Sequence, residues 1–87
     1  MSLILERMQT TTLAALERLA VATVVGFVDG DEESVRKLLA LGVAPGDRVR
    51  VLASGHACLF EVGSARYALD RELASRVLVA RETPGAA

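Results

Sequence analysis

Residues 38–50 constrain the fold more than any other stretch of this chain, because they join a helix to a strand through a tight turn. Gly42 follows a leucine-rich helical segment, where helices commonly close with a left-handed residue that glycine adopts without steric cost. Pro45 presets φ for the first central position of a type II turn, and Gly46 supplies the positive φ of the second. The sequence therefore predicts a helix-turn-strand corner with strands downstream, which favours a small β-barrel over a helical bundle.

The helix before this corner is predicted to be amphipathic. Val35, Leu38 and Leu39 are spaced three and four residues apart, so they share one face. We expect this face to pack on the barrel, with Leu41 completing the leucine-rich end of the motif. The turn at residues 29–31 precedes the helix, and its last aspartate is suited to cap it.

Three further segments are predicted to be strands. Residues 21–28 are rich in β-branched valine, and Gly26 marks a bulge or bend among them. Residues 48–52 alternate with period two, so their valines are expected to face inward and their arginines outward. Residues 76–80 form the last strand, and its valines share one side.

A tight hairpin is predicted at residues 63–64, a two-residue connection that begins with glycine. Counting outward from this turn places Glu61 opposite Arg66 and Phe60 opposite Tyr67. An opposite-charge pair and an aromatic pair both stabilise neighbouring strands. Two independent matches support this register.

A short helix is predicted near the N-terminus. Thr12 is suited to be its N-cap, and Leu13, Leu16 and Leu19 follow at three-residue steps as one apolar stripe.

The chain is long enough for one domain with one core. We expect residues 1–11 to be a flexible extension, residues 12–81 to be the domain, and residues 82–87 to be a flexible tail. The predicted architecture is mostly β with short helices: a small, partly open, SH3-like barrel of about five strands with one amphipathic helix packed on it. Aromatic residues are only 3% of the chain, so its core must be aliphatic.

Composition and charge narrow the functional classes. The chain has 10 basic and 11 acidic residues, so it lacks the net basic charge expected for binding nucleic acid. Its single cysteine allows no intrachain disulfide. Its apolar runs are shorter than the roughly 20 residues that span a bilayer, and no secretory signal is visible. These features favour a cytoplasmic protein without direct membrane insertion.

Three segments resemble the FeoA family, ferrous iron transport protein A: residues 12–16 with 22–27, residues 35–47, and residues 67–79. The resemblance implies a small cytosolic SH3-like protein that assists or regulates a membrane ferrous iron transporter carrying a GTP-binding domain. It would act by protein-protein contact. The same fold also occurs as a terminal domain in metal-dependent repressors of the diphtheria-toxin-repressor type. A metal-binding or metal-sensing domain is therefore the alternative.

His56 and Cys58 are the residues that suggest a metal site, because imidazole and thiolate two positions apart on a strand suit Zn²⁺ or Fe²⁺. A structural zinc site almost always needs four ligands, and the chain has no other histidine or cysteine. Cys58 also shares a strand face with Phe60, so we expect it in the core. No resident cofactor is predicted, and weak binding of a divalent transition metal stays open if carboxylates or a second subunit complete the site.

Four residues are candidates for a partner surface: Arg48, Arg50, Leu52 and Leu59. The favoured interpretation of the arginines is a solvated face, and the alternative is a contact strip for an acidic partner. The leucines are expected to be buried under the N-terminal helix, or else to form a small recognition patch. No nucleophile has a base in a recognisable catalytic pattern, so we predict that the chain is not an enzyme. The contact surface and a weak homo-oligomer are left open.

Overall fold

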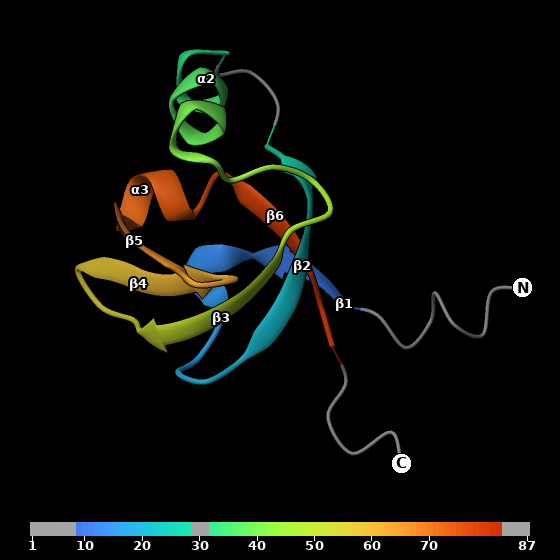
Figure 1. The fold of residues 1–87 in the computed structure, drawn as a ribbon, viewed down its shortest axis with the longest axis vertical. Coiled ribbons are helices and arrows are strands. Elements are labelled where there is room, and N and C mark those ends of the chain that lie inside the picture. The colour runs from blue at the N-terminus through green and yellow to red at the C-terminus, as the bar shows by residue number, and fades with distance from the viewer. Residues whose placement is uncertain (1–8, 29–31, 83–87) are drawn as a thin grey trace, which may run out of the picture.

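The computed structural model describes residues 9–28 and 32–82, in which one antiparallel sheet dominates (Figure 1). The elements, in chain order, are β1 (Gln9–Thr12), the 3-10 helix η1 (Leu13–Ala15), β2 (Val21–Phe27), α2 (Glu32–Leu41), β3 (Arg48–Ala53), β4 (Ala57–Val62), β5 (Ala65–Asp70), α3 (Arg71–Ala74) and β6 (Val77–Arg81). The strand order is β1-β6-β2-β3-β4-β5, so β1 and β5 are the two edges of a partly open barrel. The predicted fold class is confirmed, with six strands in place of about five.

The additional strand, β1, corrects the expected N-terminal extension. Residues 9–11 belong to a strand that pairs antiparallel with β6, with Thr11 opposite Val79. Threonine favours extended backbone, and the hydrogen-bonding partner lies almost seventy residues away in the sequence. The local pattern therefore gave no sign of the pairing. Residues 1–8 and 83–87, where the rest of the predicted extension and tail fall, lie outside the described residues.

At the other end, Glu82 is docked on the domain and is not part of a free tail. Its backbone N–H donates to the carbonyl of Val21 at 3.1 Å. Its carboxylate binds the guanidinium of Arg48, with Nε 2.9 Å from Oε2.

The predicted N-terminal helix is reduced to the single 3-10 turn η1. Thr12 has an extended backbone but makes no side-chain capping bond. Leu13 and Leu16 are 0% and 2% exposed, whereas Leu19 is 50% exposed. The apolar stripe therefore ends at Leu16, because the chain turns before Leu19 can follow it.

The predicted strand patterns are otherwise confirmed. The register between β2 and β6 shifts between Val24 and Gly26, which is the expected bulge. In β3 the side chains of Val49 and Val51 are buried, while those of Arg48 and Arg50 are exposed.

The predicted hairpin register is also confirmed. Glu61 lies opposite Arg66 and Phe60 lies opposite Tyr67, and the two aromatic rings stack with centroids 5.6 Å apart. Gly63 has φ +61°, as the first central residue of this turn requires.

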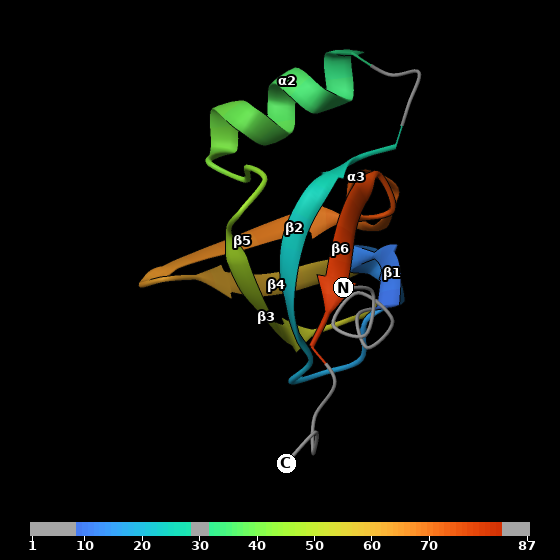
Figure 2. The ribbon, with the colours of Figure 1, turned by 90° about the vertical axis from the view of Figure 1, so that its right-hand side faces the viewer.

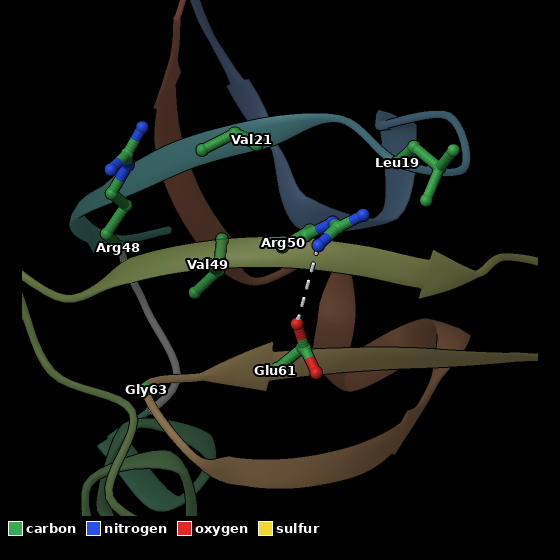
Figure 3. Close-up of a pocket in the computed structure, with 7 residues that line it drawn as sticks. All are labelled: Leu19, Val21, Arg48, Val49, Arg50, Glu61 and Gly63. Atoms are coloured by element: carbon green, nitrogen blue, oxygen red, sulfur yellow. Dashed lines mark ion pairs between the residues drawn. The ribbon is translucent and has the colours of Figure 1, made fainter.

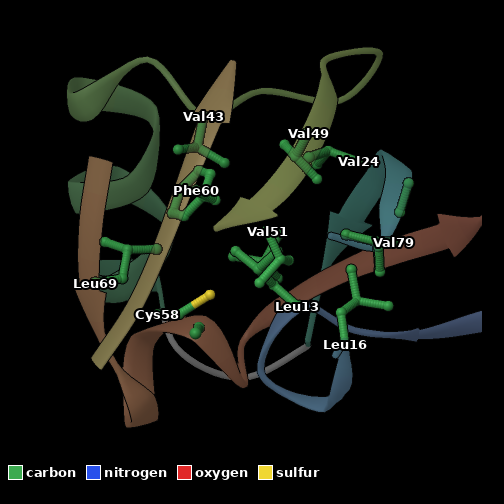
Figure 4. Packing of buried hydrophobic residues seen from close by; sticks show 14 of the residues in the cluster. Leu13, Leu16, Val24, Val43, Val49, Val51, Cys58, Phe60, Leu69 and Val79 are labelled. Atoms are coloured by element: carbon green, nitrogen blue, oxygen red, sulfur yellow. The ribbon is translucent and has the colours of Figure 1, made fainter. Parts of the chain in front are cut away.

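The core lies inside the curved sheet and is aliphatic apart from the ring of Phe60 and the thiol of Cys58 (Figure 4). The largest side chains that are fully buried in it are Phe60, Leu13, Leu16, Leu38, Val24, Val43, Val49, Val51, Val77 and Val79. At its α3 side Asp70 caps the helical turn, since its Oδ1 accepts from the N–H of Leu73 at 2.8 Å.

The helix end at the corner has the predicted left-handed glycine, with Gly42 at φ +100°. Its N–H donates to the carbonyl of Leu39, and the N–H of Val43 donates to the carbonyl of Leu38, both at 3.0 Å. These two bonds define a Schellman motif. Leu38 and Val43, both fully buried, supply its usual hydrophobic contact.

The turn that follows is also as predicted. Gly46 has φ +96°, and the N–H of Asp47 donates to the carbonyl of Ala44 at 3.1 Å. The carboxylate of Asp47 accepts in return from the N–H of Ala44 at 2.9 Å, which closes the turn from both sides.

The predicted packing face of α2 needs correction. Leu38 is the buried residue of the helix, whereas Leu39 is 48% exposed and Leu41 is 44% exposed. Two views at right angles show α2 beyond one end of the barrel, on the side of α3, and not laid flat on the sheet (Figures 1 and 2). The helix meets the barrel only at this end, and Leu38 is the side chain that it buries there. The expected helix cap at residues 29–31 lies outside the described residues.

Candidate protein-contact surface

Two separate groups of surface ion pairs involve the outward-facing arginines of β3. Glu61 lies between two arginines, with Arg66 Nε at 3.5 Å and Arg50 Nη1 at 4.0 Å from its carboxylate oxygens. Arg48 is held by Glu82 through two contacts, of 2.9 and 3.0 Å. The side chains of Arg48 and Arg50 remain 68% and 55% exposed. Exposed pairs of this kind contribute about 0–1 kcal/mol, so a partner carboxylate can compete for these arginines at little cost.

An open groove of about 590 Å³ lies on this surface (Figure 3). It is lined by Leu19, Val21, Arg48, Val49, Arg50, Glu61 and Gly63. The groove lies where β2 pairs with β3. This pairing places Val21 opposite Arg50 and covers only three residue positions. The β2 wall is therefore apolar, whereas the opposite wall carries Arg48 and Arg50 together with Glu61.

Leu19 stands at one end of the groove on a tight turn. The N–H of Ala20 donates to the carbonyl of Glu17 at 3.1 Å, and Leu19 between them has φ +72°. Its own N–H donates to the carbonyl of Val51 at 2.7 Å, which ties the turn to β3. The exposed leucine side chain is thus presented by a fixed backbone.

An ion pair to β6 secures the same turn. The guanidinium of Arg81 binds both carboxylate oxygens of Glu17. A hydrogen bond from the backbone, and then this pairing, hold the pKa of the Glu17 carboxyl below its usual value. Both interactions favour the charged carboxylate that this ion pair needs.

The four predicted contact residues are placed differently with respect to this groove. Arg48 and Arg50 line the groove together, but Leu52 and Leu59 do not. Leu52 is half-buried where the β3–β4 register shifts, and Leu59 is 37% exposed. The expected burial of Leu59 under an N-terminal helix is wrong, because Leu59 is exposed and this helix is only the turn η1.

The apolar wall of the groove does not follow from the sequence pattern. That pattern predicts Leu19 in the buried stripe of a helix and Val21 in a buried strand. No local signal separates Leu19 from Leu16, because both fit the same three-residue spacing.

His56 and Cys58 do not form a chelating pair. His56 is exposed in the bend before β4, while the Cys58 side chain is 3% exposed in the core (Figure 4). Burial raises the pKa of the Cys58 thiol, which disfavours the thiolate that binds metals. Within residues 9–28 and 32–82, no three side chains of the metal-binding types cluster together. In the same residues no helix has the length and apolar run that crossing a bilayer requires.

The fold and this surface define a class: a small, partly open SH3-like barrel that exposes an apolar and basic groove. A family model, described as the FeoA domain, matches residues 11–81. The chain belongs to the FeoA family, which is linked to ferrous iron transport. The predicted resemblance is therefore confirmed.

Solved structures agree with this assignment. A crystal structure of an iron uptake regulatory protein (FeoA) is 29% identical, with a TM-score of 0.75, over 84% of this chain and 97% of that one. FeoA of Stenotrophomonas maltophilia, solved in complex with zinc and described as a prokaryotic SH3 domain protein, is 33% identical. Its TM-score is 0.69, over 79% of this chain and 88% of that one.

A more distant likeness concerns the fold alone. A manganese-dependent transcriptional repressor in complex with manganese is 23% identical with a TM-score of 0.77. The match covers 83% of this chain but only 36% of the repressor. No curated protein sequence matches the chain.

Proposed function

We propose that this chain is a cytosolic accessory protein of a ferrous iron transporter and that it acts by binding the membrane permease that carries the GTP-binding domain. The family match over residues 11–81 supports the link to iron transport. The observation that carries the mode of action is the groove, where Arg48 and Arg50 stay largely exposed beside apolar side chains. Such a surface suits recognition of another macromolecule and offers no reacting group.

The size of the surface sets the expected strength of binding. The groove is lined by seven residues, whereas a stable standard interface buries roughly 1,200–2,000 Å² and uses about 20–30 residues a side. We therefore expect weak binding, or binding that needs the assembled permease in its membrane. Exposed arginines at the rim mainly raise the association rate and orient the partner, so the interaction should weaken with salt.

Affinity capture from membranes that contain the permease tests this function. The wild-type chain should enrich the permease, and the double substitution Arg48→Glu with Arg50→Glu should abolish the enrichment. Arg36→Glu, a charge reversal on the exposed side of α2, is the matched control and should bind as wild type. Equal enrichment by an unrelated SH3-like domain would count against the proposal.

The alternative function is metal binding or sensing, and the zinc complex of the S. maltophilia relative is the observation that favours it. His56 is exposed and could supply one ligand. Calorimetric titration with Fe²⁺, Zn²⁺ and Mn²⁺ should compare the wild type with His56→Ala. Tight binding that is lost in His56→Ala supports the alternative, and equally weak binding in both proteins removes it.

A further inference from the structure

We propose that the groove binds an acidic segment of a partner protein. Leu19 is the anchor residue of the groove, and it contacts an apolar side chain of that segment. The inference rests on the proposed function and names the contact that it uses. Its starting point is the conformation of Leu19. Among the described residues it is the one non-glycine residue with positive φ, at +72°.

This conformation is unfavourable for leucine, and burial of the side chain does not offset its cost. A side chain with a Cβ rarely adopts positive φ, and in a turn glycine fills such a position without strain. Leu19 is nevertheless 50% exposed. Strained residues that gain little from packing are concentrated at functional sites, where the strain presents a side chain in a required position.

The backbone around Leu19 is fixed on both sides of the turn. Leu19 donates to the carbonyl of Val51 at 2.7 Å, and Val51 donates back to the carbonyl of Ala20 at 2.9 Å. Arg81 holds Glu17 at the start of the same turn. A backbone that is already fixed loses little further freedom on binding, which is what an anchor residue needs.

The groove itself indicates the chemistry of the occupant. Leu19 lies at one end, Arg48 at the other, and Arg50 between them (Figure 3). At this surface three arginines, Arg48, Arg50 and Arg66, share two acids, Glu61 and Glu82, in exposed and therefore weak ion pairs. The occupant should therefore bring carboxylates to the arginines and an apolar side chain to Leu19 and Val21. Nucleic acid fits less well, because no aromatic side chain lines the groove for base stacking.

The spacing of the arginines suggests how the carboxylates are arranged. Arg48 and Arg50 are two residues apart on one strand, which separates their Cα atoms by about 7 Å. Acidic residues at alternate positions of an extended segment have the same separation. An extended acidic segment with an adjacent leucine is therefore the simplest ligand.

A defined peptide tests the groove without the permease. The probe is a ten-residue peptide of alternating glutamate and leucine, with counterparts in which lysine replaces glutamate or serine replaces leucine. NMR titration of the labelled protein should give a dissociation constant of about 0.1–1 mM. The shifts should be confined to the amides of the groove. Both counterpart peptides should bind at least about tenfold more weakly.

The decisive variant is Leu19→Gly, which removes the side chain and also relieves the positive φ. We expect its melting temperature to equal or exceed that of the wild type, while its peptide affinity falls about tenfold or more. Leu39→Ala is the matched control, since Leu39 is a similarly exposed leucine on α2, and it should bind normally. Undiminished binding by Leu19→Gly, no peptide binding, or shifts away from the groove would overturn the proposal.

A second arm separates this inference from the proposed function. In the membrane capture experiment Leu19→Gly should lose the permease that the wild type enriches. If the wild type and Leu19→Gly capture it equally, the docking inference fails and the accessory function stands. If the wild type captures no permease yet the peptide binds as expected, the groove is confirmed and the partner is wrong.

Discussion

The helix and the strand on either side of the Gly42 corner, α2 and β3, differ greatly in how deeply their apolar side chains are buried. On one side, β3 buries Val49 and Val51 to 1% and 0% exposure and is hydrogen-bonded to a strand at each edge. On the other side, α2 buries Leu38 and leaves Leu39 48% exposed. The barrel is therefore the cooperative unit, and the helix is an element attached to its end.

The attachment of α2 is concentrated at its C-terminal end. The Schellman motif places Leu38 and Val43 together in the core, and Tyr67 packs close to Gly42. Elements with few buried contacts open locally at lower free energy than the core does. We expect the helix amides to exchange faster than those of β3.

The largest effect should come from the barrel core. Phe60→Ala removes the largest fully buried side chain, and we expect it to lower the free energy of unfolding by about 3–5 kcal/mol. Urea denaturation followed by circular dichroism measures this change. Leu59→Ala, its outward-facing neighbour on β4, is the control and should cost far less. Similar losses for both would mean that the inside and outside of β4 are misassigned.

A smaller loss of unfolding free energy is expected at Gly42, where α2 is joined to the barrel. Gly42→Ala places a Cβ 3.0 Å from the hydroxyl oxygen of Tyr67 at φ +100°, and backbone strain of this kind costs about 1–3 kcal/mol. Hydrogen exchange should show α2 opening more than β3. Gly55→Ala is the control, because a Cβ there meets nothing within 4 Å. Adding Tyr67→Phe should recover part of the loss, and no recovery would exclude this contact as a cause.

The buried thiol predicts how the barrel responds to alkali. The folded-state pKa of Cys58 lies above its ordinary value of 9.0, because burial disfavours the thiolate. The unfolded chain therefore ionises first, and the stabilising contribution is complete below pH 9 and is lost as pH rises through the folded pKa. Melting temperatures from pH 7 to 10.5 should fall more steeply for the wild type than for Cys58→Ala. Parallel curves would show that this thiol is not linked to folding.

The smallest effect should come from the exposed side of the helix. The sequence pattern placed Leu39 in the packing face, which would make Leu39→Asp strongly destabilising. Its 48% exposure instead predicts a change within about 0.5 kcal/mol. Leu38→Asp, which buries an unpaired charge, should unfold the domain. Circular dichroism melts of the two variants show which of the two adjacent leucines packs against the barrel.

Local chemistry was enough to predict most of the barrel. The glycines at positions 42, 46 and 63 each have the positive φ that their turns require. The hairpin register followed from counting outward to Phe60 and Tyr67. These features depend on residues close together in sequence, where steric rules act directly.

The features that were missed depend on distant partners. β1 exists because β6 pairs with it from the far end of the chain. Leu19 leaves its apolar stripe because its N–H reaches Val51 on β3. Within the candidate site, the arginines were predictable from strand alternation, but the apolar wall required the pairing of β2 with β3.

The pairing of the first and last strands has a further consequence. Gln9 lies opposite Arg81, so the described chain begins and ends at neighbouring positions of the sheet. Such a domain can be inserted into a longer polypeptide, or circularly permuted, without crossing its own core. The occurrence of the same fold within about a third of a manganese-dependent repressor shows this portability. The barrel can thus be joined to other polypeptides at one place, where its first and last strands lie side by side.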